Sequence, residues 1–182
     1  DVCSSDLFVF AVLVTLVAQA VAAAYPERPI RLVVSSPPAG TSDVLGRPVM
    51  QKVGERLGRQ IVIDNRAGAS GNIGVEIAAR AAPDGYTLLF GQTQTLAVNP
   101  TLYKNLAFDP LKDFAPVAMV GSVVFLLVAA PSLPAANLPD LIKLAKARPG
   151  QITYASASPG AVSHLTGEMF RLRSEEHTSE LQ

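Results

Sequence analysis

Three loops rich in glycine, serine and threonine carry the residues that could do chemistry in this sequence. They span residues 35–43 (SSPPAGTSD), 91–95 (GQTQT) and 156–164 (SASPGAVSH). The first and third loops each follow a strand pattern and open a helix pattern. A helix N-terminus offers unpaired N–H groups and a partial positive charge, so it can hold an anion without Lys or Arg. Two such loops facing each other would suit a carboxylate. Ordinary loops with Ser or Asp helix caps are the alternative.

Motifs typical of enzymes are weak in this sequence. The stretch GASGNIG at residues 68–74 lacks the lysine of a phosphate-binding loop, and its spacing is not that of a dinucleotide loop. The sequence has no G-x-S-x-G nucleophile motif. His164 has neither a cysteine nor a second histidine nearby, which argues against a typical His/Cys metal site. We therefore predict no catalytic residue, no metal and no cofactor.

A Ser–His pair is the remaining catalytic possibility in the third loop. Ser156, Ser158 and Ser163 crowd the same short segment as His164, which is poor geometry for a nucleophile and its base. We expect His164 instead to start a helix and to form a hydrogen bond across a cleft.

The composition is that of a folded, electrically balanced chain. Of the 182 residues, 49% are hydrophobic, and the formal net charge is zero. The apolar fraction excludes disorder over most of the chain. The balanced charge gives no indication of nucleic acid or an anionic membrane as a partner. A single cysteine excludes an intrachain disulfide framework, and the length allows one domain or parts of two.

The two ends of the sequence, residues 1–7 (DVCSSDL) and 173–182 (RSEEHTSELQ), lack the apolar periodicity of a helix or strand. The two complementary strands of a single DNA string can encode both ends. One choice of codons for RSEEHTS has a reverse complement that translates as DVCSSDL. The shared string is similar to a common sequencing adapter. We interpret both ends as translated adapter and exclude them, with Cys3 and His177, from the predicted fold. A natural polar N-terminus and acidic tail are the alternative.

Residues 8–24 combine an apolar run with small residues at its end. Ala22 and Ala24 fit the small-x-small pattern of an export-signal cleavage site, which places the cut after Ala24. A membrane anchor is the alternative, but the run is short for a full span and no basic cluster follows it. We expect an export signal whose basic beginning is missing, and a mature portion, residues 25–172, outside the cytoplasm.

Strand patterns recur along the mature portion and alternate with helix patterns. β-Branched and apolar residues predict strands at residues 30–35, 61–65, 87–91, 116–122, 123–130 and 152–156. A polar loop is predicted between the third of these strands and Asn99. Strands that alternate with helices indicate an α/β fold with a mainly parallel sheet.

Four helices are predicted between these strands. The first starts with Ser42 or Asp43 as its cap and runs to about residue 59. Its residues at spacings of four form an apolar face, namely Leu45, Val49, Val53 and Leu57. Pro48 should kink this helix or delay its start. The other helices are predicted at residues 72–82, 137–148 and 160–172.

Four stretches of the mature portion carry a resemblance to a known family. In chain order they read YPERPIRLVVSSPPAGTSD, IVIDNRAGASGNIGVEIAARAAPDGYTLLFG, NPTLYKNLAFDPLKDFAPVAMVGS and PGQITYASASPGAVSHLTGEMF. Over essentially all of residues 25–172 the sequence is similar to the substrate-binding receptors of tripartite tricarboxylate transporters, the Bug family. The resemblance implies an α/β fold of the periplasmic-binding-protein type II class, with two parallel-sheet lobes and no catalysis. Because members are longer, it implies an incomplete second lobe: residues 25–121 resemble the N-terminal part of the first lobe, and 122–172 the start of the second.

The resemblance also implies which residues line the cleft. The family's first loop reads Pro-Pro-Gly-Gly-x-x-Asp, and here Ala39 replaces a glycine; in the third loop Ser158 stands where glycine is common. Asp43 would not attract a carboxylate, so it should cap the helix, hold water, or meet the amino group of an amino-acid ligand. The implied ligand-binding residues are Pro38, Ala39, Gly40, Thr41, Asp43, Gln92, Thr93, Ser156, Ser158, Gly160, Ala161, Ser163 and His164.

The implied function is that of a periplasmic receptor, monomeric when complete, which closes around a small carboxylate and delivers it to membrane permease subunits. The implied ligands are di- or tricarboxylates, aromatic acids and amino acids. A sensory binding protein that acts without transport and an exported α/β hydrolase are the alternatives. Because the cleft needs both lobes, we expect the 182-residue chain to bind its ligand poorly or not at all.

Overall fold

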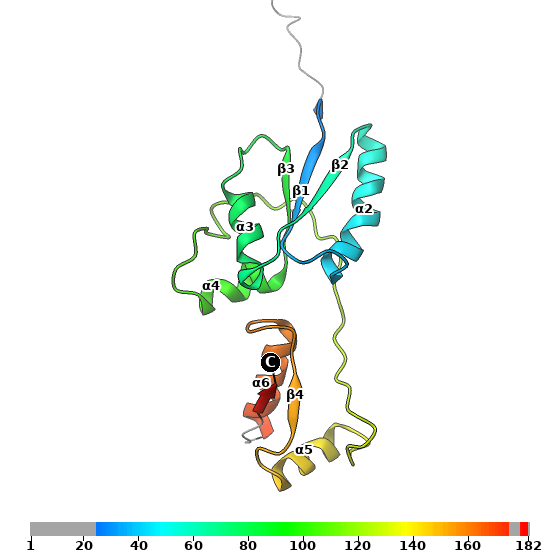
Figure 1. Cartoon of the computed structure of the whole chain (residues 1–182), viewed down its shortest axis with the longest axis vertical. Helices are drawn as coiled ribbons and strands as arrows, with labels where there is room; N and C mark the ends of the chain where they lie inside the picture. Colours follow the sequence, from blue (N-terminus) through cyan, green and yellow to red (C-terminus); the bar gives the residue numbers. More distant parts are fainter. Residues whose placement is uncertain (1–24, 175–178, 182) are drawn as a thin grey trace, which may run out of the picture.

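Three parallel strands form the central sheet in a computed structural model that describes residues 25–174 and 179–181 (Figure 1). The strands β1 (Ile30–Val34), β2 (Ile61–Asn65) and β3 (Thr87–Phe90) lie in the order β2-β1-β3. In the central strand, Arg31 pairs with Val62 on one side and with Thr87 on the other. The apolar side chains of β1 are at most 1% exposed and form the core. The strands predicted at residues 30–35, 61–65 and 87–91 are confirmed.

Helices follow the first two strands, because parallel neighbours need a crossover connection. α2 (Thr41–Leu57) packs along β2, whereas α3 (Asn72–Ala79) packs against β1 and β3. A short turn, η1 (Ala69–Gly71), precedes α3. Figure 1 shows the sheet between the two helices. This arrangement confirms the predicted α/β class with a parallel sheet.

The start of α2 differs from the prediction. Gly40, and neither Ser42 nor Asp43, occupies the N-cap position, and no side chain caps the helix. The later start expected from Pro48 is wrong, because α2 runs through this residue. Pro48 and Val44 are both exposed, so water can reach the Val44 carbonyl that proline leaves without its helical hydrogen bond.

The face of α2 that meets the sheet also differs from the prediction. Leu45, Val49 and Leu57 are exposed, so the expected apolar face is not the buried one. The buried residues are small or polar, namely Ser42, Asp43 and Gly46. A Cβ atom on Gly46 would lie 3.2 Å from ring atoms of Phe90, so glycine allows the close approach of α2 to the sheet.

The segment after β3 is helical, and the predicted polar loop is wrong. A π-helix, η2 (Gln94–Val98), leads directly into α4 (Asn99–Leu102). The buried Asn99 donates from Nδ2 to the Ser70 carbonyl (3.1 Å) and to Asn72 Oδ1 (2.6 Å). This buried polar side chain therefore ties the helical segment to the start of α3.

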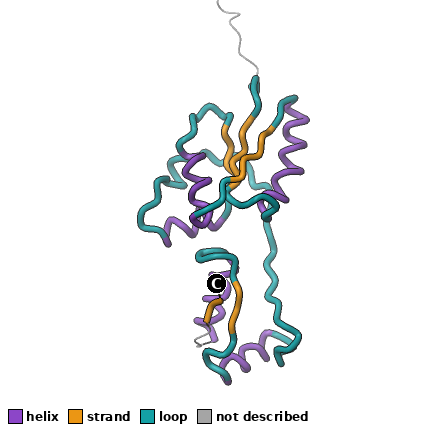
Figure 2. Tube along the Cα trace, viewed as in Figure 1, coloured by secondary structure: helices purple, strands orange, loops and turns teal. Residues whose placement is uncertain are grey.

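An extended stretch, residues 116–130, leads from the sheet to the rest of the chain, and Figure 2 draws it as loop throughout. The two strands predicted here are wrong for the described part of the chain, where no strand pairs with this stretch. Its apolar side chains lie in solvent; Val124, Leu126 and Val128 are between 82% and 83% exposed. An apolar run becomes a strand only when a neighbour satisfies its backbone groups, and the described residues supply none.

The second part of the chain contains α5 (Leu138–Ala147), β4 (Thr153–Ala155) and α6 (Val162–Ser174). Asn137 caps α5, because its Oδ1 accepts a hydrogen bond from the Asp140 N–H (2.9 Å). The predicted order of helix, strand and helix is confirmed, with α6 starting two residues later than expected.

Some of residues 173–182, which we interpreted as adapter, belong to a helix and a strand of this second part. α6 extends to Ser174, and β5 (Ser179–Leu181) pairs in parallel with β4, where Tyr154 is opposite Glu180. The expectation that this end forms no helix or strand is wrong, while its origin stays a prediction. The N-terminal adapter and export-signal predictions, residues 1–24, lie outside the described residues. Among the described helices, none is long and apolar enough to cross a membrane.

Candidate ligand-binding site

The first loop, residues 35–43, turns sharply from β1 into α2. The Gly40 N–H donates to the Pro37 carbonyl (3.1 Å), which closes a four-residue turn with Pro38 second and Ala39 third. Ala39 has a φ of 62°, as the third residue of a type II turn requires. Its N–H donates to Oδ2 of Asp43 (2.9 Å). The side chain of Asp43 therefore fixes the turn from within the first turn of α2.

The carboxylate of Asp43 is buried, with the residue 3% exposed, and is held on both oxygens. Arg47 donates from Nε to Oδ2 (2.9 Å) and forms an ion pair between Nη2 and Oδ1 (2.9 Å), and Asn65 Nδ2 donates to Oδ1 (3.1 Å). The hydrogen bonds from Arg47 and from the Ala39 N–H lower the pKa of Asp43 to about 2. Asp43 is therefore ionised at neutral pH, and its negative charge is paired with Arg47 inside the protein.

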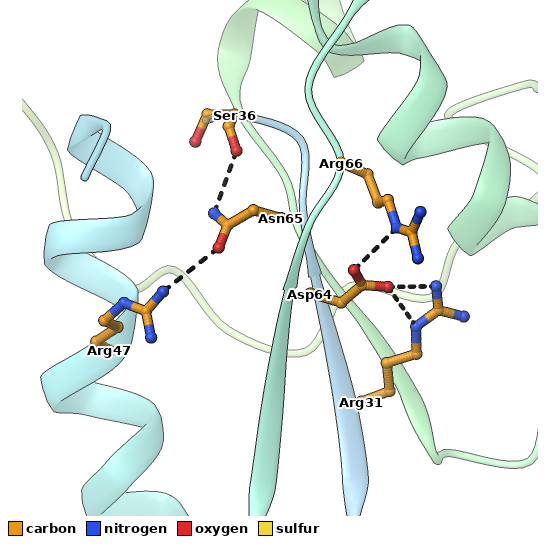
Figure 3. Close-up of polar contacts among 6 residues, drawn as sticks. All are labelled: Arg31, Ser36, Arg47, Asp64, Asn65 and Arg66. Carbon is orange, nitrogen blue, oxygen red and sulfur yellow. Dashed lines mark hydrogen bonds and ion pairs between the residues drawn. The ribbon is translucent and has the colours of Figure 1, made fainter. Parts of the chain in front are cut away.

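Figure 3 shows how the end of β2 supports this loop. Asn65 donates from Nδ2 to the Ser36 carbonyl (3.2 Å) and accepts on Oδ1 from Arg47 (3.4 Å). The preceding residue, Asp64, is held by Arg31 and Arg66. Burial alone would raise the pKa of Asp64, but the hydrogen bonds from both arginines outweigh burial and lower it. Both carboxylates near this strand end are thus paired with arginine.

The N-terminus of α2 presents backbone donors. Its first helical hydrogen bond runs from the Val44 N–H to the Gly40 carbonyl (2.9 Å), and no side chain caps the helix. The N–H groups of residues 41–43 precede this bond. Together with the helix dipole, such groups can bind an anion.

The second loop, residues 91–95, contacts both other loops. Gln92 donates from Nε2 to Ser42 Oγ in the first loop. Gln94 donates from Nε2 to Ser158 Oγ (3.1 Å) and to the Pro159 carbonyl (3.3 Å) in the third loop. The three predicted loops are therefore brought together by two glutamine side chains.

The third loop, residues 156–164, repeats the turn of the first. The Ala161 N–H donates to the Ser158 carbonyl (3.0 Å), and Gly160 has a φ of 79°. The Gly160 N–H donates to Nδ1 of His164 (3.2 Å), so a neutral His164 carries its proton on Nε2. Ser163 Oγ accepts from the Ala157 N–H (3.2 Å). This places both Ser163 and His164 in hydrogen bonds of their own loop; a bond of His164 across the cleft stays a prediction.

The candidate residues differ in how accessible they are. Pro38, Ala39, Thr41 and Thr93 are exposed, while Asp43, Gly160 and Ala161 are buried. The others are half-buried, namely Gly40, Gln92, Ser156, Ser158, Ser163 and His164. Direct contact of each residue with a ligand stays a prediction.

Sequence reasoning missed three residues of the site, Arg47, Gln94 and Asn65. The spacing of four between Asp43 and Arg47 is the signal that could have found the first, because such pairs meet on a helix. Gln94 lies in the Gln-Thr-Gln-Thr run, but only the π-helix directs its side chain to the third loop. Within residues 25–174 and 179–181, no three His, Cys, Asp or Glu side chains are grouped so that they could hold a metal ion.

Loops at the carboxyl ends of parallel strands are where open α/β folds bind their ligands, and solved structures of periplasmic binding proteins share the fold of this chain. Among solved structures, the chain is similar to R. palustris Rpa4515 with adipate (TM-score 0.74, 32% identity, covering 86% of this chain and 52% of that one). It is also similar to MatC (Rpa3494) from Rhodopseudomonas palustris with bound malate (TM-score 0.75, 29% identity, covering 86% and 53%). BugD, described as a periplasmic binding protein, matches with a TM-score of 0.68 and 31% identity, covering 86% of this chain and 52% of BugD.

Within this class, the chain belongs to the tripartite tricarboxylate transporter receptor family, whose profile matches residues 45–179. Protein BugT of Bordetella pertussis (strain Tohama I) is 42% identical over 150 residues, which cover 82% of this chain and 46% of BugT. The chain thus spans about half the length of the curated relatives it matches. These matches confirm the resemblance to the Bug family.

Proposed function

We propose that the complete receptor captures a small carboxylate between the first and third loops for a tripartite tricarboxylate transporter. The observation that carries the proposal is the pair of matching turns, each opening a helix and each contacted by the second loop. The bound adipate and malate named for two structural neighbours support a carboxylate as the ligand class.

In this proposal the ligand is held by backbone donors. The carboxylate oxygens accept hydrogen bonds from the N–H groups of residues 41–43 at α2 and of residues 162–164 at α6, where the Leu165 N–H to Ala161 carbonyl bond (3.0 Å) is the first of the helix. Small residues in both turns let the ligand approach the backbone closely. Ser158 and Gln94 already contact each other across the two parts and keep them together around the ligand. The receptor binds and releases its ligand without catalysis.

The proposed setting follows from the family. The receptor is exported to the periplasm by residues 8–24, acts as a monomer when complete, and passes its ligand to the permease subunits of the transporter. Backbone donors of this kind suit small carboxylates, so a panel of di- and tricarboxylates is the first test.

Removal of one backbone donor tests the proposal at the first loop. Thr41 is the first residue of α2, a position that accepts proline, and Gly40 before it has φ −67° and ψ 164°, which suits a residue preceding proline. Thr41→Pro should therefore fold while lacking one N–H. Calorimetric titration of the complete receptor with adipate, malate and citrate should show affinity reduced by about one to two orders of magnitude, since hydrogen bonds to charged groups contribute about 1.5–3 kcal/mol.

Thr41→Ala is the matched control, because it removes the hydroxyl and keeps the N–H. It should bind the same carboxylate with nearly unchanged affinity. Equal affinity of Thr41→Pro and the parent would contradict binding at the α2 N-terminus. If no carboxylate of the panel binds to the parent receptor, the proposed function itself is wrong.

A further inference from the structure

The side chain of Gln94 connects the two parts of the chain. Its Nε2 donates to Ser158 Oγ (3.1 Å) and to the Pro159 carbonyl (3.3 Å), across 64 and 65 positions of the sequence. An amide nitrogen carries two N–H groups, so the contact uses both of them. Gln94 lies in η2, which follows β3, whereas both acceptors lie in the third loop, which opens α6. Two hydrogen bonds from one side chain therefore hold the third loop against η2.

The third loop also packs closely on the segment that carries Gln94. A Cβ atom on Gly160 would lie 2.5 Å from Leu102 Cδ1 and 3.5 Å from both Val98 Cγ1 and Asn99 Oδ1. We call these three residues at the end of η2 and in α4 the seat of the third loop. Asn99 is fully buried, and its Nδ2 is hydrogen-bonded to the segment that starts α3. The seat is therefore a fixed feature of the first part of the chain.

The Gln94 contact is made by protein groups alone. The donors proposed for the ligand are the N–H groups of residues 41–43 and 162–164, and neither Gln94 nor its two acceptor atoms belong to this set. Gln92 differs from Gln94, because it donates to Ser42 and so joins two segments of the first part. The strength of the Gln94 contact therefore does not depend on which ligand is bound.

Release of a ligand requires the two parts to separate, because the ligand is proposed to lie between the first and third loops. Separation breaks both hydrogen bonds of Gln94 and removes Gly160 from its seat. These contacts favour the closed form over the open form, and opening of a closed site often limits the rate of release. Since no ligand atom takes part in the contact, its effect on release should be the same for every ligand.

We propose that Gln94 is a positioning residue: it acts as a latch between η2 and the third loop, and it lengthens the residence of every bound carboxylate by the same factor. The inference rests on the proposed function and adds a determinant of ligand release to it. It assigns residence time to η2 and the seat, and it leaves the choice between ligands to the groups that contact them.

Gln94→Met in the complete receptor tests the proposal, because methionine keeps the length of the side chain and removes both donors. Stopped-flow kinetics with adipate, malate and citrate should show koff raised about tenfold for each acid that binds, as expected when two ordinary hydrogen bonds are lost. The factor should agree between the acids within about twofold, as for independent effects. The value of kon should not fall, because the ligand enters while the two parts are separated and the latch is open.

A double-mutant cycle with Ser158→Ala tests whether Gln94 acts through the third loop. Ser158→Ala removes one acceptor and leaves the Pro159 carbonyl in place. Gln94→Met should therefore raise koff by a factor about threefold smaller in the Ser158→Ala receptor than in the parent. Equal factors in the two backgrounds would overturn the latch. Gln94→Ala, which also removes both donors, replaces Gln94→Met in the cycle if the methionine variant does not fold.

Gln51→Met is the matched control, because Gln51 donates from Nε2 to Glu55 Oε1 (3.2 Å) within α2. It should leave koff as in the parent. An unchanged koff in a folded Gln94→Met receptor would overturn the inference and leave the proposed function intact. Factors that differ strongly between the acids would overturn it as well, because they would show that Gln94 contacts the ligand. If no acid binds to the parent receptor, the proposed function is wrong, and the inference with it.

Discussion

The first and third loops reach the same backbone geometry with different residues. In the first, the turn from Pro37 to Gly40 places proline second and Ala39 third; in the third, the turn from Ser158 to Ala161 places proline second and Gly160 third. Both third residues have positive φ, and both donate their N–H to the side chain four residues later. The acceptors are Asp43 and His164. A carboxylate in one loop and an imidazole nitrogen in the other thus fix the same turn.

The two loops differ in whether glycine is the third or the fourth residue of the turn. The first loop has alanine followed by glycine, and the third has glycine followed by alanine. A Cβ on Gly40 would lie 3.1 Å from the Pro37 carbonyl oxygen, so this position is crowded. A Cβ on Gly160 would lie 2.5 Å from Leu102 Cδ1. Gly40 is therefore crowded by an atom of its own turn, whereas Gly160 is crowded by a side chain from outside its loop.

The largest effect is expected from Gly160→Ala. This change places a side chain at positive φ and against Leu102, and it should lower the free energy of unfolding by about 2 kcal/mol. Urea denaturation of the chain measures the loss. Gly58→Ala is the control, because Gly58 has a φ of 63° but no heavy atom within 4 Å of its added Cβ. It should lose only about 1 kcal/mol. Equal losses would show that packing against Leu102 contributes nothing.

A smaller effect is expected on the pH dependence of the free energy of unfolding. It should distinguish the charged acceptor of the first loop from the imidazole of the third. The pKa of Asp43 is lowered from 3.8 to about 2, first by the hydrogen bond from Arg47. A lowered pKa stabilises the fold fully above the unfolded value, and this contribution is lost as the pH falls from about 4 to about 2. Unfolding curves across this range should fall less steeply for Asp43→Asn than for the parent. Parallel curves would show that the ionised carboxylate does not stabilise the first loop.

The smallest effect is expected from Ala39→Gly, which gives the first loop the glycine that the third already has. Relief of the positive φ should outweigh the extra freedom of glycine in the unfolded chain, for a gain of about 0.5 kcal/mol. Thermal unfolding detects the gain as a higher Tm. A lower Tm would mean that Ala39 is not strained and that the two turns are less alike than their hydrogen bonds indicate.

Much of the fold could be predicted because its signals are local. β1 is a short run of branched apolar residues between a proline and a Pro/Gly loop, and Asn137 is an ordinary helix cap. Residues 123–128 carry an equally strong strand pattern, yet they form no strand in the described part of the chain. β1 differs from this segment because a hydrogen-bonded strand lies on each side of it. A sequence pattern does not show whether such neighbouring strands are available.

The positions of the three loops could be predicted from the sequence, but the side-chain hydrogen bonds of the site could not. Strand ends and helix starts located all three loops, because ligand-binding loops follow the carboxyl ends of parallel strands. The first two loops follow β1 and β3 of one sheet, and the third follows β4 of another. The partners of Asp43 and the reach of Gln94 were missed. An arginine on an exposed helix usually faces solvent, and a π-helix has no simple sequence signal. Both contacts depend on elements far apart in the chain, such as Asn65 on β2 and Ser158 before α6.

The extended stretch has a consequence for handling the protein in solution. Residues 123–128 (VVFLLV) contain no charge, no proline and no glycine, and all six are exposed. Short segments of this composition stack between copies into cross-β assemblies with dry side-chain interfaces. Aggregation of the 182-residue chain should therefore rise steeply with its concentration, and a single lysine within this segment should oppose fibril growth.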